Sequence, residues 1–142
     1  MSNNRVEARV SLINQKMKFS GVAGENEPIT LDYIPPLGDG EGYMPLEMFL
    51  MSLASCSGAS AALLLRKMGK AVEGMEVKAK GIRREQHPTS FQTITLALYL
   101  NSSNAENADF EKAIKLSEET YCPVWAMIKN SVEINVEFEL KS

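Results

Sequence analysis

The stretch PLEMFLMSLASCSGASAALLLRKM, residues 45–68, dominates the organisation of this chain. It has no charged residue over the eighteen positions from Met48 to Leu65. Pro45 suits the first turn of a helix, where a missing N–H is harmless, and the following Gly69 suits a left-handed cap. The pattern predicts one helix of 24 residues, about 36 Å long and apolar on every side. Such a helix must be covered all round.

The same stretch approaches the length of a membrane-spanning helix, which needs about 20 apolar residues. Six of its eighteen uncharged residues are only weakly hydrophobic, namely Ser52, Ser55, Cys56, Ser57, Gly58 and Ser60. The rest of the chain also offers amphipathic strands that need an apolar surface to pack on. We therefore expect a core helix and no membrane partner.

The composition is that of a globular protein. The 142 residues suffice for a hydrophobic core, and we expect a single domain over residues 1–142. The net charge of −3 argues against a nucleic-acid partner. The residues before Val6 contain no apolar signal core, so we expect a cytoplasmic protein.

Alternating apolar and polar residues predict strands at residues 6–12, 17–21, 29–33, 72–82, 90–100 and 132–140. A second helix is expected to begin at Asn104 or Asn107, both good N-caps. It should close at Cys122, because the residue before Pro123 avoids the helical conformation, and Pro123 can start a short third helix. The resulting order, β-β-β-α-β-β-α-α-β, predicts an α+β fold with antiparallel sheets.

Cys56 and Cys122 are the reactive pair that the sequence offers. Sixty-five residues lie between them, so they form no Cys-x-x-Cys motif. The N–H groups after Pro123 are placed to stabilise a thiolate at Cys122. The single histidine, His87, lies in a charged turn, and no metal site or phosphate loop is expected. Spacing alone leaves open that both cysteines are buried small hydrophobic residues.

Two motifs resemble a known family. The sequence MPLEMFLMSLASCS, residues 44–57, resembles the central-helix motif of the OsmC/Ohr family. In that motif a proline and an acidic residue open the helix, and small-small-Cys follows about eleven residues after the proline. The sequence ETYCPV, residues 119–124, resembles the family's second-cysteine motif. The order of elements agrees too, so the resemblance covers essentially the whole chain.

The resemblance implies an intertwined homodimer, in which the antiparallel sheets of both chains wrap two long central helices. It also implies thiol-dependent reduction of organic hydroperoxides in an antioxidant stress response. Cys56 would be the peroxidatic thiolate that becomes a sulfenic acid, and Cys122 the resolving thiol of a Cys56–Cys122 disulfide. An external dithiol reductant would restore both thiols, and no cofactor is implied.

Two positions differ from the peroxide-reducing branch of that family. That branch has an acid ten residues before the first cysteine, where this chain has Leu46, and the nearest acid is Glu47. It also uses an arginine near the first turn, where this chain has Lys16 and Lys18, which cannot make a bidentate clamp. Glu47 is predicted either to assist the thiol or to complement the helix dipole.

Helical geometry bears on both Glu47 and the dimer. Nine residues place Glu47 about 13 Å along the helix from Cys56 and near its opposite face, so the two cannot meet within one chain. An antiparallel second copy would bring its own Glu47 towards this Cys56. The small residues Ala54, Gly58 and Ala62 recur every four positions and would let a second helix approach closely.

Two functions remain open at this level. The first is a thiol peroxidase that acts on organic hydroperoxides. The second is a binding protein or redox sensor on the same scaffold, which holds a small apolar ligand without turnover, because a fold does not settle a function. Formation of a Cys56–Cys122 disulfide on exposure to peroxide would distinguish them.

Overall fold

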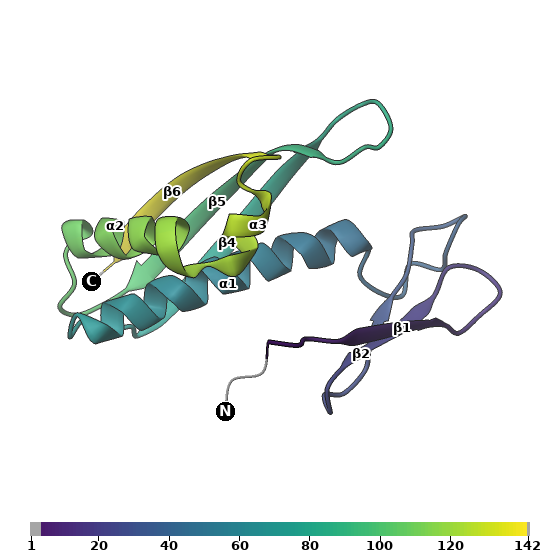
Figure 1. Cartoon of the computed structure of the whole chain (residues 1–142), viewed down its shortest axis with the longest axis horizontal. Helices are drawn as coiled ribbons and strands as arrows, with labels where there is room; N and C mark the ends of the chain where they lie inside the picture. Colours follow the sequence, from purple (N-terminus) through teal and green to yellow (C-terminus); the bar gives the residue numbers. More distant parts are fainter. Residues whose placement is uncertain (1–3, 142) are drawn as a thin grey trace. The chain divides into compact units, whose positions relative to one another are not determined.

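The structure is a computed structural model that describes residues 4–141. In chain order its elements are β1 (Ala8–Leu12), β2 (Phe19–Ala23), β3 (Ile29–Leu31), α1 (Pro45–Lys67), β4 (Gly74–Arg83), β5 (Phe91–Asn101), α2 (Asn107–Leu116), the π-helical turn η1 (Ser117–Tyr121), α3 (Pro123–Ile128) and β6 (Glu133–Lys141) (Figure 1). This order confirms the predicted α+β class. The chain divides into two compact units, Met1–Phe49 and Leu50–Ser142. The expectation of a single domain stays a prediction.

The first unit contains an antiparallel meander in the order β1-β2-β3. The predicted pairing is confirmed, with Leu12 opposite Phe19 next to the first turn. However, β1 is exposed along its whole length, and its Val10 and Leu12 are 57% and 54% exposed. The predicted half-burial of this strand is therefore wrong for the single chain, because the described residues do not cover its apolar side chains.

A buried carboxylate shapes the loop between β3 and α1. Asp32 is 1% exposed and accepts hydrogen bonds from the backbone N–H groups of Tyr33, Asp39 and Glu41. Burial opposes the ionisation of Asp32, but these donors outweigh it and hold the pKa of this carboxyl below its usual value. The loop also requires Gly38, because a Cβ there would lie 2.3 Å from Asp32 Oδ1.

Helix α1 matches the predicted helix to within one residue. Glu47 lies in its first turn, and its carboxylate accepts a hydrogen bond from the Met44 N–H at 2.8 Å. At the other end Gly69 has a φ of 78°, and the Lys70 N–H donates to the Leu65 carbonyl at 2.9 Å. These two features form the glycine-terminated cap that the sequence predicted.

Most of α1 is not covered by its own chain. Its length and composition would allow it to cross a membrane, and 33% of its most apolar window is buried. The buried residues are Leu53, Ser57, Gly58, Ala61 and Leu65, which follow one another at helical spacing. Because they form a single stripe, the remaining apolar surface of the helix calls for a further covering surface.

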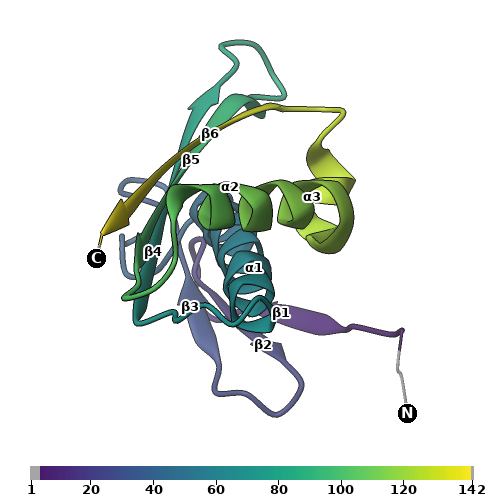
Figure 2. The ribbon, with the colours of Figure 1, turned by 90° about the vertical axis from the view of Figure 1, so that its left-hand side faces the viewer.

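The second unit holds the sheet β4-β5-β6, with its helices on one face (Figures 1 and 2). Strands β4 and β5 are antiparallel, as predicted. Strands β5 and β6 are parallel, with Thr93 opposite Glu133 and Asn101 opposite Lys141. The expectation of wholly antiparallel sheets is wrong here. The reason is the long connection through α2, η1 and α3, which returns the chain to the starting end of β5.

The start of α2 also differs from the prediction. Its N-cap is Glu106, which forms a capping box with Asp109, and neither Asn104 nor Asn107 caps the helix. Asn104 instead accepts a hydrogen bond from the Ala71 N–H at 2.8 Å. Its side chain is therefore committed to the loop that follows α1.

The core of this unit lies between the sheet and the helices. The inward face of β5 supplies the buried residues Ile94, Leu96, Leu98 and Leu100. Phe110 of α2 is fully buried and meets Phe138 of β6 edge to face, with 5.4 Å between the ring centroids. This contact fixes α2 against the edge strand.

We predict that Phe110→Ala lowers the free energy of unfolding by about 3–5 kcal/mol, because it leaves a cavity in the core. Phe138 is 37% exposed, so Phe138→Ala should cost less, about 1–2 kcal/mol. Guanidinium denaturation followed by the fluorescence of Trp125, at one fixed protein concentration, measures both. Equal losses for the two variants would contradict this account of the core.

Candidate active site

The structure brings the two cysteines together. Cys56 lies in the middle of α1 and Cys122 lies between η1 and α3, and the Cys122 side chain is near enough to help raise the pKa of the Cys56 thiol. Both are free thiols, but they differ in access: Cys56 is half-buried, whereas Cys122 is 2% exposed. A reagent from solvent therefore reaches Cys56, and Cys122 is accessible mainly from Cys56 itself.

A local break in the helical path sets the position of Cys122. The Cys122 N–H donates to the Ser117 carbonyl, five residues earlier, which closes the π-helical turn η1. Cys122 then leaves the helical conformation, with φ −85° and ψ 106°, as expected of a residue before proline. Pro123 begins α3, as predicted. Isolated π turns of this kind are frequent at functional sites.

The first turn of α3 brings backbone N–H groups to the thiol pair. The Trp125 N–H donates to Cys122 Sγ at 3.4 Å, which confirms the predicted donors after Pro123. The Val124 N–H lowers the pKa of the Cys56 thiol, an influence that the sequence did not predict. The Val124 N–H therefore favours the thiolate of Cys56.

Ser57 is a further polar neighbour that the sequence analysis missed. It is 5% exposed, and its Oγ lies 3.7 Å from Cys122 Sγ. Ser117 donates from its hydroxyl to the Ser57 carbonyl at 3.5 Å. The sequence does contain a signal for Ser57: it lies four residues after Leu53 and four before Ala61, on the buried apolar stripe of α1. A polar residue in such a stripe needs a hydrogen-bond partner.

The electrostatic environment keeps Cys56 protonated at neutral pH. Burial raises the pKa of the Cys56 thiol, and the Cys122 side chain adds to this rise, while the Val124 N–H lowers it. Within residues 4–141, no basic side chain contributes to this shift. The reactive thiolate therefore forms in increasing amounts as the pH rises above neutrality.

The charged residues that the sequence suggested as assistants of the Cys56 thiol all have partners within the first unit. Glu47 accepts the Met44 N–H, the role of a first-turn carboxylate, so its involvement at Cys56 stays a prediction. Lys16 Nζ lies 2.8 Å from Asp39 Oδ1, and Lys18 pairs with Glu41. Both lysines that stand where the peroxide-reducing branch has its arginine are thus held by carboxylates.

The same ion pairs bear on metal binding. Within residues 4–141, one group of side chains has the spacing of metal ligands: Asp32, Asp39 and Glu41, whose ligand oxygens lie within 4.8 Å of one another. Lys16, Lys18 and three backbone N–H groups already balance these carboxylates. We therefore assign this group to the structure of the loop.

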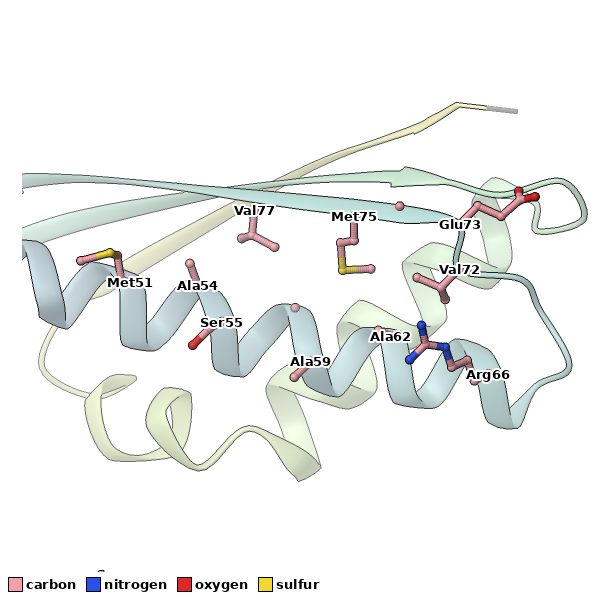
Figure 3. A pocket seen from close by; sticks show the side chains of 12 residues that line it. Met51, Ala54, Ser55, Ala59, Ala62, Arg66, Val72, Glu73, Met75 and Val77 are labelled. Carbon is pink, nitrogen blue, oxygen red and sulfur yellow. The ribbon is translucent and has the colours of Figure 1, made fainter. Parts of the chain in front are cut away.

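A groove of about 650 Å³ runs between α1 and the edge strand β4 (Figure 3). Ala54, Gly58 and Ala62 line its helical wall, and neither cysteine does. A Cβ added to Gly58 would lie 2.9 Å from Val77 Cγ2. Gly58 thus admits the neighbouring strand β4, and the approach of a second helix to Ala54, Gly58 and Ala62 stays a prediction.

We predict that Cys56 reacts with iodoacetamide well before Cys122, and that its rate rises about tenfold per pH unit from pH 7 to the raised pKa of Cys56. The reason is that the thiolate fraction grows tenfold per unit below the pKa of a thiol. Mass spectrometry of the two cysteine peptides after timed alkylation measures both rates. A rate for Cys56 that is independent of pH above 7 would contradict the raised pKa.

Comparison with known proteins places the chain in a family. It matches the OsmC-like protein family over residues 38–137. It is 30% identical over 135 residues to Protein YhfA of Escherichia coli strain K12, which covers 95% of this chain and 98% of YhfA. A hypothetical protein from Aquifex aeolicus VF5 superposes with a TM-score of 0.86 and 30% identity over 98% of both chains. The organic hydroperoxide resistance protein OhrB of Bacillus subtilis shares the fold, with a TM-score of 0.64 and 13% identity over 95% of this chain and 98% of OhrB. The chain belongs to the OsmC-like protein family.

Proposed function

We propose that the protein is a thiol-dependent peroxidase that reduces organic hydroperoxides. The observation that carries this proposal is the proximity of an accessible thiol, Cys56, to a buried thiol, Cys122. Cys56 can meet a substrate from solvent. Cys122 is buried, so its reaction partner is the oxidised form of Cys56. The names of structural relatives such as OhrB support the same substrate class.

The proposed reaction has two steps on the chain and one outside it. The Cys56 thiolate attacks the O–O bond of the hydroperoxide, so that an S–O bond forms and the alkoxide leaves and takes up a proton. Cys122 then attacks the sulfur of the Cys56 sulfenic acid, the S–S bond forms, and the oxygen leaves as water. An external dithiol reduces the disulfide by exchange and is itself oxidised. We place this cycle in the cytoplasm, where such dithiols are abundant.

The immediate surroundings support this division of roles. The Val124 N–H lowers the pKa of the attacking thiol, Cys56, and the Trp125 N–H donates to Sγ of the resolving thiol, Cys122. The raised pKa of Cys56 means that the first step is slow at neutral pH in the single chain.

We also propose that the working form is a homodimer. Two surfaces of the chain support this: most of the apolar helix α1 is uncovered, and β1 exposes its whole length. The first unit has an almost wholly apolar groove of about 390 Å³, with Val10, Ile29 and Leu31 in its lining. Covering these surfaces with a second copy would remove a large apolar area from water, at ~25 cal/mol per Å².

Stoichiometric cumene hydroperoxide should convert the two thiols into one intramolecular disulfide. Cys56→Ser should abolish peroxide consumption, because it removes the attacking sulfur. Cys122→Ser should leave one turnover and a sulfenic acid at Cys56 that a dimedone probe traps. Thiol counting and peptide mass spectrometry give the result. Two free thiols and no trapped sulfenate after peroxide would refute the enzyme.

Sedimentation equilibrium tests the dimer. We expect no folded monomer at micromolar concentration, because an uncovered apolar helix disfavours the separate chain. The expected species has twice the 15.7 kDa mass of the chain. A compact species of 15.7 kDa that unfolds cooperatively would refute the dimer and remove the proposed role of a second copy's Glu47 at Cys56.

The groove between α1 and β4 favours a second candidate, binding of a small apolar ligand without turnover. Its volume of about 650 Å³ lies within the range of small-molecule sites, and neither thiol lines it. Protein with both thiols alkylated should then bind an apolar fluorescent probe as well as untreated protein does. Ala59 lines the groove, so the bulky substitution Ala59→Trp should reduce binding of the probe if the groove is the binding site.

A further inference from the structure

The buried sulfur of Cys122 has hydrogen-bond contacts with two separate helices. The Trp125 N–H, in the first turn of α3, donates to Cys122 Sγ at 3.4 Å. Ser57 of α1 places its Oγ 3.7 Å from the same sulfur. Within residues 4–141, Cys122 Sγ is the hydrogen-bond partner that the structure shows for the Ser57 hydroxyl. The residue next to Cys56 in the chain therefore contacts the other cysteine of the pair.

Ser117 of η1 ties Ser57 to Cys122. Its hydroxyl donates to the Ser57 carbonyl at 3.5 Å, and its carbonyl accepts the Cys122 N–H at 2.9 Å. Both hydrogen bonds engage the backbone of Ser57 or of Cys122, so they do not depend on the side chain at position 57. This arrangement keeps Ser57 Oγ near Cys122 Sγ, and the hydroxyl can be removed without removing the tie.

The protonation state of Cys122 decides which atom donates in this contact. While Cys122 is a thiol, either its S–H or the Ser57 hydroxyl can be the donor. A thiolate has no proton, so the Ser57 hydroxyl must then donate to the sulfur. Ser57 is 5% exposed and Cys122 is 2% exposed, and a hydrogen bond to a charged group is strong where water is excluded. The contact is therefore stronger with the thiolate than with the thiol.

We propose that the Ser57 hydroxyl stabilises the Cys122 thiolate, both when Cys122 attacks the oxidised Cys56 and when it leaves during reduction of the disulfide. The inference rests on the proposed function, because both steps belong to the proposed cycle.

The hydroxyl contacts the reacting sulfur in each of these steps. In the first, the Cys122 thiolate attacks the sulfur of the Cys56 sulfenic acid, the S–S bond forms, and hydroxide leaves and takes up a proton. In the second, a thiolate of the external dithiol attacks the accessible Cys56 sulfur, the S–S bond breaks, and Cys122 leaves with the electron pair. The other thiol of the dithiol then displaces Cys56, and the dithiol is oxidised to its disulfide.

Both steps can be measured without peroxide. An excess of dithiobis(nitrobenzoate) should first form a mixed disulfide at Cys56 and release one aryl thiolate. Attack by the Cys122 thiolate then releases a second aryl thiolate, in a phase that does not depend on reagent concentration and that stopped-flow absorbance resolves. The product contains the Cys56–Cys122 disulfide. Its reduction by dithiothreitol is followed by timed alkylation and peptide mass spectrometry.

Ser57→Ala removes the donor and keeps the carbonyl that Ser117 contacts. We expect the second phase to be about threefold slower at pH 7, because an about tenfold smaller thiolate fraction is partly offset by the greater nucleophilicity of a less stabilised thiolate. At a pH that ionises Cys122 fully in both proteins, Ser57→Ala should instead be about threefold faster than the parent. Reduction of its disulfide should be about threefold slower, because the less stabilised thiolate is a poorer leaving group.

Three further variants separate a lost donor from a disturbed structure. Ser57→Thr keeps a hydroxyl and should stay within about twofold of the parent in both reactions, whereas Ser57→Val has the shape of threonine without the hydroxyl and should behave as Ser57→Ala does. Ser52→Ala alters an exposed serine one turn before Cys56 in the same helix and should change each rate less than about twofold.

The sign of the effect at the two pH values decides the matter. A second phase that Ser57→Ala slows at both pH values would overturn the inference, because a structural disturbance and not a lost donor acts in this way. A second phase that stays at the parent rate at both would also overturn it. Either result would leave the proposed disulfide cycle standing. The absence of a second phase in the parent protein would refute the disulfide itself, and with it both proposals.

Discussion

The rest of the structure depends on one constraint, a long helix with no charge over most of its length. Helix α1 must be covered on all sides, yet its own chain buries one stripe of it. The sheet β4-β5-β6 and the helices packed on it cover that stripe. This packing holds Cys122 against Ser57, in the middle of α1. The uncovered apolar surface is the physical reason to propose a second copy.

The thiol pair owes its geometry to the break between α2 and α3. A regular helix would carry residue 122 onward along its axis, whereas the π turn and Pro123 stop the helix and restart it. The restart exposes free N–H groups: that of Trp125 donates to Cys122 Sγ, and that of Val124 lowers the pKa of Cys56. The groups that this chain offers to its two cysteines are therefore backbone N–H donors.

The use of backbone donors near Cys56 has a consequence for its pKa. Backbone dipoles carry only partial charge, and they do not offset the burial of Cys56, whose pKa stays raised. The lysines that could have supplied a full charge are paired with Asp39 and Glu41. In the proposed cycle the attacking step should therefore become faster as the pH rises above neutrality.

Local patterns in the sequence determined the helix over residues 45–67, its glycine cap, six strands and the break at Pro123, because caps and periodicity act over a few residues. The two motifs also determined the family. Only the tertiary structure decided that β6 runs parallel to β5, that Gly58 faces its own β4, and that Ser57 Oγ lies 3.7 Å from Cys122 Sγ. These features depend on how segments that are distant in the sequence pack against one another. A local sequence pattern does not determine the direction in which a distant strand pairs.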